Sequence, residues 1–230
     1  LGSDAIALAP FTSRIVYLED GDWAVISRDS VEIFDEHDRP ADRPETAAPP
    51  AAFLVDRGAH RHFMAKEIHE QPEVIGHTLA HYLDFSEEAL RLPETQSIDF
   101  AGLDRLTIAA CGTASYAGMI GRYWFERLAR LPVEIDVGSE FRYREPPVES
   151  GRLALVISQS GETADTLASQ RYCRDQGMRT AAVVNVATSS IAREADIVFP
   201  TLAGPEIGVA STKAFTCQLA GLACLAVAAG

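Results

Sequence analysis

The chain has 230 residues, 47% of them hydrophobic, and a formal net charge of −13. A chain of this length forms one large domain, or one domain with part of another. The negative charge argues against nucleic acid or an acidic membrane surface as a partner, because like charges repel. The longest apolar run, residues 219–229, is shorter than the ~20 residues of a membrane-spanning helix, so no membrane partner is expected.

Four cysteines lie in apolar segments without C-x-x-C spacing: Cys111, Cys173, Cys217 and Cys224. This usage, together with the lack of a recognisable signal peptide, predicts reduced thiols and a cytoplasmic location. His77 and His81 have a spacing that metal sites use. No third ligand of a suitable type is evident beside them, so we expect solvated helix faces and no metal site.

Residues 1–35 are predicted to be mainly β structure. Apolar runs at 14–18 and 23–27 flank Asp20-Gly21, a pair typical of β-hairpin turns, and a third run covers 31–34. Short strands of this kind are barely stable alone and leave unpaired edges. We therefore expect this segment to be the end of a larger β-containing domain.

A proline-rich segment, residues 36–60, is interpreted as an extended linker. Residues 61–230 are predicted to form one domain. It opens with a helical pattern from Arg61 to about residue 83, in which Pro72 either kinks the helix or begins a second one.

Strand and helix patterns alternate from residue 105 onward. This alternation predicts an α/β fold with a doubly wound, five-stranded parallel sheet. The expected strands are 105–110, 132–137, 153–157, 180–184 and 196–199, and the expected helices are 116–131, 162–176 and one from Ser211 onward. If the strand order is the flavodoxin-like 2-1-3-4-5, ligands bind beyond the carboxyl ends of the first and third strands.

The turns that leave those two strands are small, polar and contain glycine. Residues 158–163 place three hydroxyl groups and one amide side chain at the start of a helix, on Ser158, Gln159, Ser160 and Thr163. Unpaired backbone N–H groups and the positive end of a helix favour an anion, most often a phosphate. The same residue types also cap helix ends internally, and that alternative stays open.

Several other catalytic patterns are absent from the sequence. It contains neither the dinucleotide-binding G-x-G-x-x-G after the first strand nor a P-loop. The Gln159-Ser160-Gly161 turn lacks the first glycine of the hydrolase motif G-x-S-x-G. Cys111 lies where a thiolate is favoured, although a small packed residue is the simpler interpretation of its position.

Several segments together closely resemble the isomerase half of the glutamine–fructose-6-phosphate aminotransferase family. They are Ala110-Cys-Gly-Thr113, Glu140-Phe-Arg-Tyr-Arg144, the segment 158–166 (SQSGETADT), the segment 206–216 (EIGVASTKAFT), Lys66–Pro72 (KEIHEQP) and Tyr123-Trp-Phe-Glu126. The segment 158–166 alone indicates only a sugar isomerase (SIS) domain. Residues 1–35 resemble the end of the family's glutaminase domain.

The resemblance implies conversion of fructose 6-phosphate to glucosamine 6-phosphate with ammonia from glutamine, without a cofactor. It assigns the phosphate to Ser158, Gln159, Ser160 and Thr163, and the sugar to Cys111, Gly112, Thr113, Val209, Ala210 and Ser211. Ala114 stands where the family commonly has serine, which puts one hydroxyl contact in doubt.

The resemblance also implies that no catalytic residue lies in this chain. The family's nucleophilic cysteine begins the glutaminase domain, and its other catalytic groups come from a second SIS domain and the C-terminal tail. We therefore expect structural roles for Glu206 and Lys213, a homodimer, and glutamine binding through the missing domain. The chain alone is expected to bind sugar phosphate weakly or not at all and to be inactive. A stand-alone sugar-phosphate sensor and a simple aldose–ketose phosphate isomerase remain the alternatives.

Overall fold

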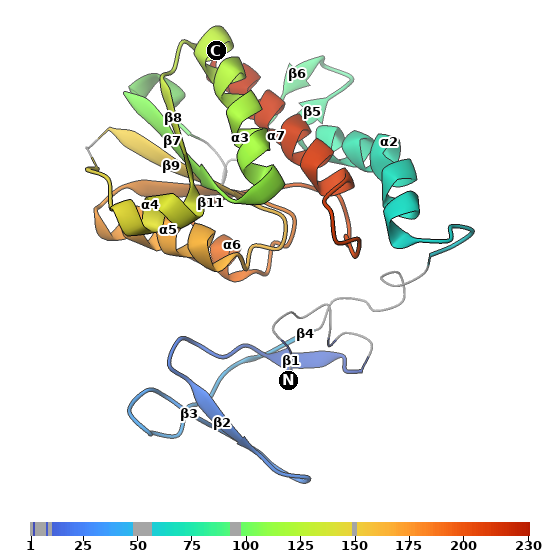
Figure 1. The fold of residues 1–230 in the computed structure, drawn as a ribbon, viewed down its shortest axis with the longest axis vertical. Helices are drawn as coiled ribbons and strands as arrows, with labels where there is room; N and C mark the ends of the chain where they lie inside the picture. Colours follow the sequence, from blue (N-terminus) through green and yellow to red (C-terminus); the bar gives the residue numbers. More distant parts are fainter. Residues whose placement is uncertain (1, 3–7, 9–10, 48–56, 93–97, 149–150) are drawn as a thin grey trace. The chain divides into compact units, whose positions relative to one another are not determined.

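The computed structural model describes residues 2, 8, 11–47, 57–92, 98–148 and 151–230 (Figure 1). The chain divides into two compact units, Leu1–Gly58 and Ala59–Gly230. No helix in the described ranges combines the length and the apolar character that crossing a membrane requires.

The first unit consists of two antiparallel strand pairs. The pairs are β1 (Arg14–Val16) with β4 (Glu45–Ala47), and β2 (Trp23–Ile26) with β3 (Val31–Phe34). The hairpin predicted at Asp20-Gly21 is therefore wrong, because the strands on either side of that turn pair elsewhere. A bidentate contact from Arg43 holds Asp22 at 2.8 and 2.9 Å, which ties the turn to the segment that leads to β4. That segment, predicted as a linker only, thus contributes a strand.

The second unit contains the predicted five-stranded parallel sheet. Its strands are β7 (Arg105–Ala110), β8 (Val133–Val137), β9 (Arg152–Ser158), β10 (Arg179–Val184) and β11 (Ile197–Pro200). Their order across the sheet is β8-β7-β9-β10-β11, and all pairs are parallel. This is the order 2-1-3-4-5 in chain sequence, which confirms the predicted doubly wound fold.

Helices cover both faces of this sheet (Figure 1). On one face lie α3 (Gly112–Trp124) and α7 (Lys213–Ala229), and α2 (Phe63–Tyr82) packs against α7. On the other face lie α4 (Gly138–Arg144), α5 (Ala164–Asp175) and α6 (Ser190–Glu194). The α4–α6 face of the central strands presents Ala109, Ala154 and Ala182, whereas the α3–α7 face presents larger residues such as Ile108 and Leu155. Buried on both faces, the central strands are apolar almost throughout, as parallel strands generally are.

Several short elements were not predicted. They are α4, α6, β5 (Leu83–Asp84), β6 (Ala89–Leu90), the 3₁₀ turn η3 (Phe100–Gly102) and the π-helical turn η4 (Phe125–Ala129), which follows α3. The helix α3 begins four residues before its predicted start, because Gly112 with a φ of 58° lets the chain turn directly from β7 into the helix.

Pro72 lies inside α2, which is one helix and not two. A proline has no N–H group to donate to the carbonyl oxygen four residues earlier, here that of Ile68. The side chain of Gln71 replaces this donor, with Nε2 3.0 Å from the Ile68 oxygen. This side-chain hydrogen bond allows the helix to continue past the proline.

Candidate functional site

A cavity of about 290 Å³ lies at the carboxyl ends of β7 and β9. All residues predicted for the site line it except Ala210: Cys111, Gly112, Thr113, Ser158, Gln159, Ser160, Thr163, Val209 and Ser211. The lining also includes residues that were not predicted to bind a ligand, namely Ala114, Ile157, Glu206, Gly208 and Gln218. The three segments predicted from the sequence therefore meet around one cavity.

Two helices begin at this cavity. Cys111 is the N-cap of α3 and Thr163 is the N-cap of α5, and neither side chain makes a capping hydrogen bond in the described structure. The first backbone N–H groups of a helix have no partner within the helix. The positive ends of two helix dipoles therefore favour negative charge at the place where the cavity opens.

The β9–α5 turn uses two of its hydroxyl groups internally. Ser158 Oγ accepts a hydrogen bond from the Gly161 N–H at 3.0 Å, and Ser160 Oγ accepts one from the Glu162 N–H at 3.1 Å. These two N–H groups, expected to be available to an anion, are thus capped, and this part of the expectation is corrected. A hydroxyl that accepts a bond can still donate its own hydrogen, so Ser158 and Ser160 remain donors toward the cavity.

Contacts with α6 fix the shape of this turn. The Ser190 N–H donates to Glu162 Oε1 at 2.8 Å, and the Ile191 N–H donates to the Gly161 carbonyl at 3.0 Å. Thr163 Oγ1 lies 3.3 Å from Ser158 Oγ. The fold itself therefore holds the hydroxyl groups of Ser158 and Thr163 close together.

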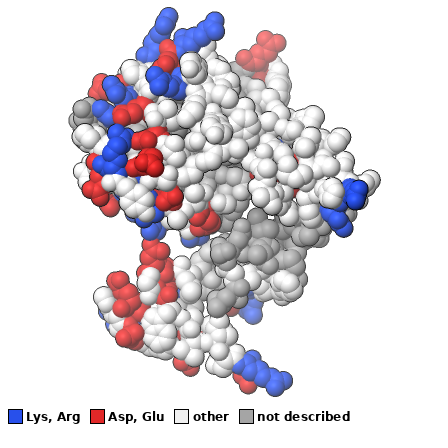
Figure 2. Space-filling model, in the orientation of Figure 1, with Lys and Arg blue, Asp and Glu red and all other residues white. Residues whose placement is uncertain are grey.

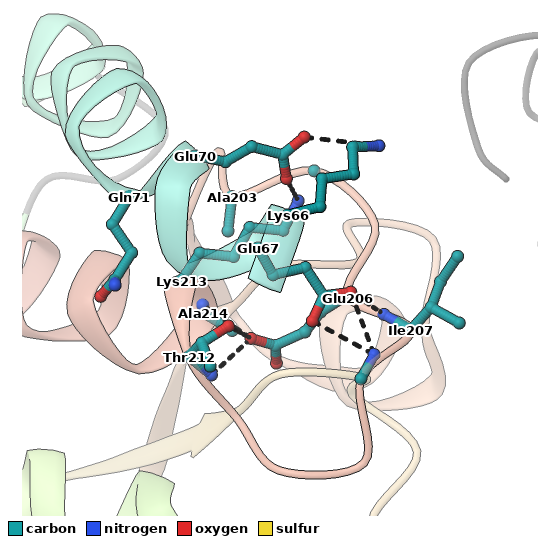
Figure 3. A network of polar contacts seen from close by, with 12 residues as sticks. Lys66, Glu67, Glu70, Gln71, Ala203, Glu206, Ile207, Thr212, Lys213 and Ala214 are labelled. Atoms are coloured by element: carbon teal, nitrogen blue, oxygen red, sulfur yellow. Dashed lines mark hydrogen bonds and ion pairs between the residues drawn. The ribbon is translucent and has the colours of Figure 1, made fainter. Parts of the chain in front are cut away.

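The loop from Gly204 to Thr212 forms another wall of the cavity, and a polar network holds it (Figure 3). Glu206 Oε1 accepts from the N–H groups of Thr212 at 2.7 Å and Ala214 at 3.2 Å, so it caps α7. Lys213, only 4% exposed, donates from Nζ to Glu70 Oε2 at 2.8 Å. Glu206 thus holds the backbone at the start of α7, and Lys213 links α7 to α2 through Glu70.

Glu70 lies between two amines. Burial alone raises the pKa of this carboxyl group, but the hydrogen bond from Lys213 and the charges of Lys213 and Lys66 outweigh it, so the net pKa is below the ordinary glutamate value. Lys66 Nζ lies 3.4 Å from Glu70 Oε1. Glu70 therefore remains ionised at neutral pH and keeps both amines in place.

All four cysteines are free thiols. Burial raises the pKa of Cys173 to about 12, and it also raises the pKa of Cys217 and Cys224. Cys111 is partly exposed in the cavity and lies 3.6 Å from Thr166 Oγ1, which is oriented to donate to its sulfur. In the described ranges, no three or more His, Cys, Asp or Glu side chains are grouped so that they could hold a metal ion.

Gln218 is a cavity residue that was not predicted from the sequence. It lies in α7, its side chain lines the cavity, and the residue is 2% exposed. Its Oε1 atom is buried without a hydrogen-bond partner in the described structure. The sequence feature that points to it is an uncharged polar residue in a mostly apolar helix. Such a residue is costly to bury without a partner, so its presence there indicates a site.

Comparison with known proteins gives both a family and close relatives. The family description "SIS domain" matches residues 100–228. The glutamine–fructose-6-phosphate aminotransferase (isomerizing) of Brucella abortus is 64% identical over 229 residues, and that of Mesorhizobium japonicum is 66% identical over 230. Each match covers all of this chain but 38% of the relative, so the chain spans well under half the length of these proteins.

A solved structure supports the same relationship. The C-terminal domain of glucosamine-fructose-6-phosphate aminotransferase from Francisella tularensis superimposes with a TM-score of 0.67 at 43% identity. The match covers 76% of this chain and 49% of that structure. The resemblance inferred from the motifs is confirmed, and the chain belongs to the SIS domain family.

Proposed function

We propose that the cavity binds a sugar phosphate, fructose 6-phosphate or glucosamine 6-phosphate, as one half of an isomerase site. The observation that carries the proposal is the convergence of two helix N-termini and a set of hydroxyl groups on one cavity. The relatives' name adds the reaction: transfer of an amino group from glutamine to fructose 6-phosphate with isomerization.

The phosphate group belongs at the β9–α5 turn. Ser158, Ser160 and Thr163 supply hydroxyl donors there, and the start of α5 supplies backbone N–H groups. No Lys or Arg is among the residues that line the cavity in the described structure. Neutral donors and the helix dipole therefore provide the binding energy, and the sugar extends toward Thr113 and the loop 208–211.

Within the described lining of the cavity there is no histidine or lysine, and the thiol of Cys111 accepts a hydrogen bond from Thr166. The one carboxylate of this lining, Glu206, already accepts hydrogen bonds from Thr212 and Ala214. General acid–base catalysis needs a positioned group that is free to exchange a proton. We therefore infer that this chain binds the substrate without converting it, and that glutamine chemistry and the acid–base groups belong to other parts of the relatives.

We also propose that the protein is a cytoplasmic homodimer. Four side chains spaced along one face of α3 are exposed: Tyr116 (59%), Met119 (42%), Ile120 (37%) and Tyr123 (72%). Figure 2 shows few charged side chains over α3 and α7 in this view, while they gather over α4 and α5. An exposed apolar face of this kind favours association with another protein surface.

Replacing Thr163 by valine tests the phosphate site. Valine keeps the shape of threonine but removes a hydroxyl donor, and a hydrogen bond to a charged group contributes about 1.5–3 kcal/mol. We expect at least about tenfold weaker binding of glucosamine 6-phosphate, fructose 6-phosphate and inorganic phosphate. Isothermal titration calorimetry and ligand-dependent thermal shifts measure the loss.

Thr188→Val is the matched control, because Thr188 is exposed and does not line the cavity. It should bind all three ligands as the unmodified chain does. Equal affinities of the Thr163 and Thr188 variants would remove the phosphate site from the β9–α5 turn. Turnover of fructose 6-phosphate by the chain alone, with or without glutamine, would contradict the inference that it only binds.

A further inference from the structure

The side chain of Glu67 joins α2 to the cavity loop. It is 2% exposed, and its Oε1 accepts hydrogen bonds from the backbone N–H groups of Ile207 at 2.6 Å and Gly208 at 3.0 Å. Its second oxygen, Oε2, lies 3.2 Å from the Gly208 nitrogen. Figure 3 shows this carboxylate directed from α2 toward the backbone of the loop.

A carboxylate buried to this degree needs partners, because burial of an unpaired charge is costly. Glu67 forms no ion pair within the described part of the chain, and its sequence neighbour Lys66 pairs with Glu70 instead. Its partners are the two backbone N–H groups of the loop. These two N–H groups therefore compensate the charge of Glu67, and they do so only while the loop keeps its position.

A second carboxylate holds the other end of the same loop. Glu206 accepts from Ser211 Oγ at 3.2 Å and from the Thr212 N–H at 2.7 Å. Between these two attachments lies Val209, whose side chain is fully exposed, and Gly208, Val209 and Ser211 all line the cavity. Two carboxylates thus hold the wall formed by residues 208–211: Glu67 at its start and Glu206 at its end.

We propose that Glu67 is a positioning residue that sets the affinity of the cavity for the sugar portion of its ligand. The inference rests on the proposed function, because it assigns the sugar to the loop and the phosphate to the β9–α5 turn. That turn is held by separate contacts, from Glu162 to Ser190 and from Gly161 to Ile191. A change at Glu67 should therefore affect the sugar and not the phosphate.

The variant Glu67→Gln tests this directly in the 230-residue chain. Glutamine has the same shape but replaces one acceptor oxygen by an NH₂ group and removes the charge, so the hydrogen bonds to the loop weaken. We expect glucosamine 6-phosphate to bind about tenfold more weakly while inorganic phosphate binds within about twofold of the unmodified chain. Backbone N–H exchange in residues 207–212 should be faster in the variant.

Glu73→Gln is the matched control, because it makes the same chemical change on the same helix at an exposed position. It should leave both affinities and the exchange of the loop unchanged. Should Glu67→Gln fail to fold, Glu67→Asp keeps the charge but withdraws it from the loop, and the same selective loss is expected.

Two results would overturn the inference: unchanged binding of glucosamine 6-phosphate in the Glu67 variants, or an equal loss for both ligands, which indicates general destabilisation. A third outcome is that the unmodified chain binds neither glucosamine 6-phosphate nor inorganic phosphate. That outcome contradicts the proposed function itself, whereas the first two leave it standing.

Discussion

Gly161 lies at the one point of the β9–α5 turn where no side chain fits. A Cβ atom built there lies 1.9 Å from Ser189 Oγ and 2.9 Å from Val184 Cγ2. Its φ of 68° is also in the left-handed region, which side-chain-bearing residues rarely adopt. The close approach of the turn to α6, which shapes the cavity, therefore depends on a glycine.

We predict that Gly161→Ala lowers the free energy of unfolding by about 2–4 kcal/mol, the sum of a steric and a backbone contribution. Gly177→Ala separates the two, because Gly177 has a φ of 80° but no atom within 4 Å of a built Cβ. That variant should lose only about 1 kcal/mol. Urea denaturation followed by circular dichroism measures both. Equal losses would show that Ser189 moves aside freely.

Whether a residue of the site could be predicted from the sequence depends on how far along the chain its partners lie. The hydroxyl groups of Ser158, Ser160 and Thr163 were predictable, because they share one turn and a parallel sheet brings its outgoing turns to one edge. Glu67 was not, because its partners Ile207 and Gly208 are 140 and 141 residues away. No local pattern reports such a pairing.

The helix α2 compensates for its internal proline with one of its own side chains. The Gln71 side chain occupies the Ile68 carbonyl that Pro72 leaves without a donor. An interior proline costs a helix about 3 kcal/mol relative to alanine, and a replacement hydrogen bond recovers only part of this. The helix that carries Glu67 and Glu70 is therefore less stable than its length suggests.

Pro72→Ala should raise the free energy of unfolding by about 1–3 kcal/mol, because alanine restores the backbone hydrogen bond to Ile68. Gln71→Ala should lower it by about 0.5–1 kcal/mol when Pro72 is present. The same change should have almost no effect in the Pro72→Ala background. A double-mutant cycle of urea denaturation curves measures this coupling, and additive effects would contradict the proposed role of Gln71.

The five strands of the parallel sheet were predicted to within one residue at either end, and β9 and β10, which are buried on both faces, appear in the sequence as nearly uninterrupted apolar runs. The pairing of β1 with β4 was not predictable, because the partner, Glu45–Ala47, has no strand pattern and is fixed from a distance by contacts such as Arg14 with Glu45. The short helices α4 and α6 were missed because five to seven residues give too little periodicity to recognise.

The two units of the molecule differ in how much apolar surface they bury. In the described part of the first unit only Ile15 belongs to the buried hydrophobic set, and Val25, Ile26 and Val31 are each about half exposed or more. The second unit has two extensive cores, one on each face of its sheet. Local stability should follow this difference, since burial is the main favourable term in folding.

We predict that backbone N–H groups of β9 and β10 exchange with solvent at least about a hundredfold more slowly than those of β2 and β3. Hydrogen exchange followed by mass spectrometry measures both in one sample of the whole chain. Glucosamine 6-phosphate should slow exchange near the β9–α5 turn and leave β2 and β3 unchanged. Equal protection of the two units would contradict this view of the molecule.

The chain has two lysines, Lys66 and Lys213, and both end at the same carboxylate, Glu70. Their side chains differ in exposure, at 25% and 5%. Isotopic methylation of amines therefore places its side-chain labels on the two sides of Glu70, with Lys66 reacting first. The other basic side chains, apart from histidines, are arginines, which amine methylation does not label. Nuclear magnetic resonance can therefore follow the contact between α2 and α7 through the two methylated lysines, beside the label on the terminal amino group.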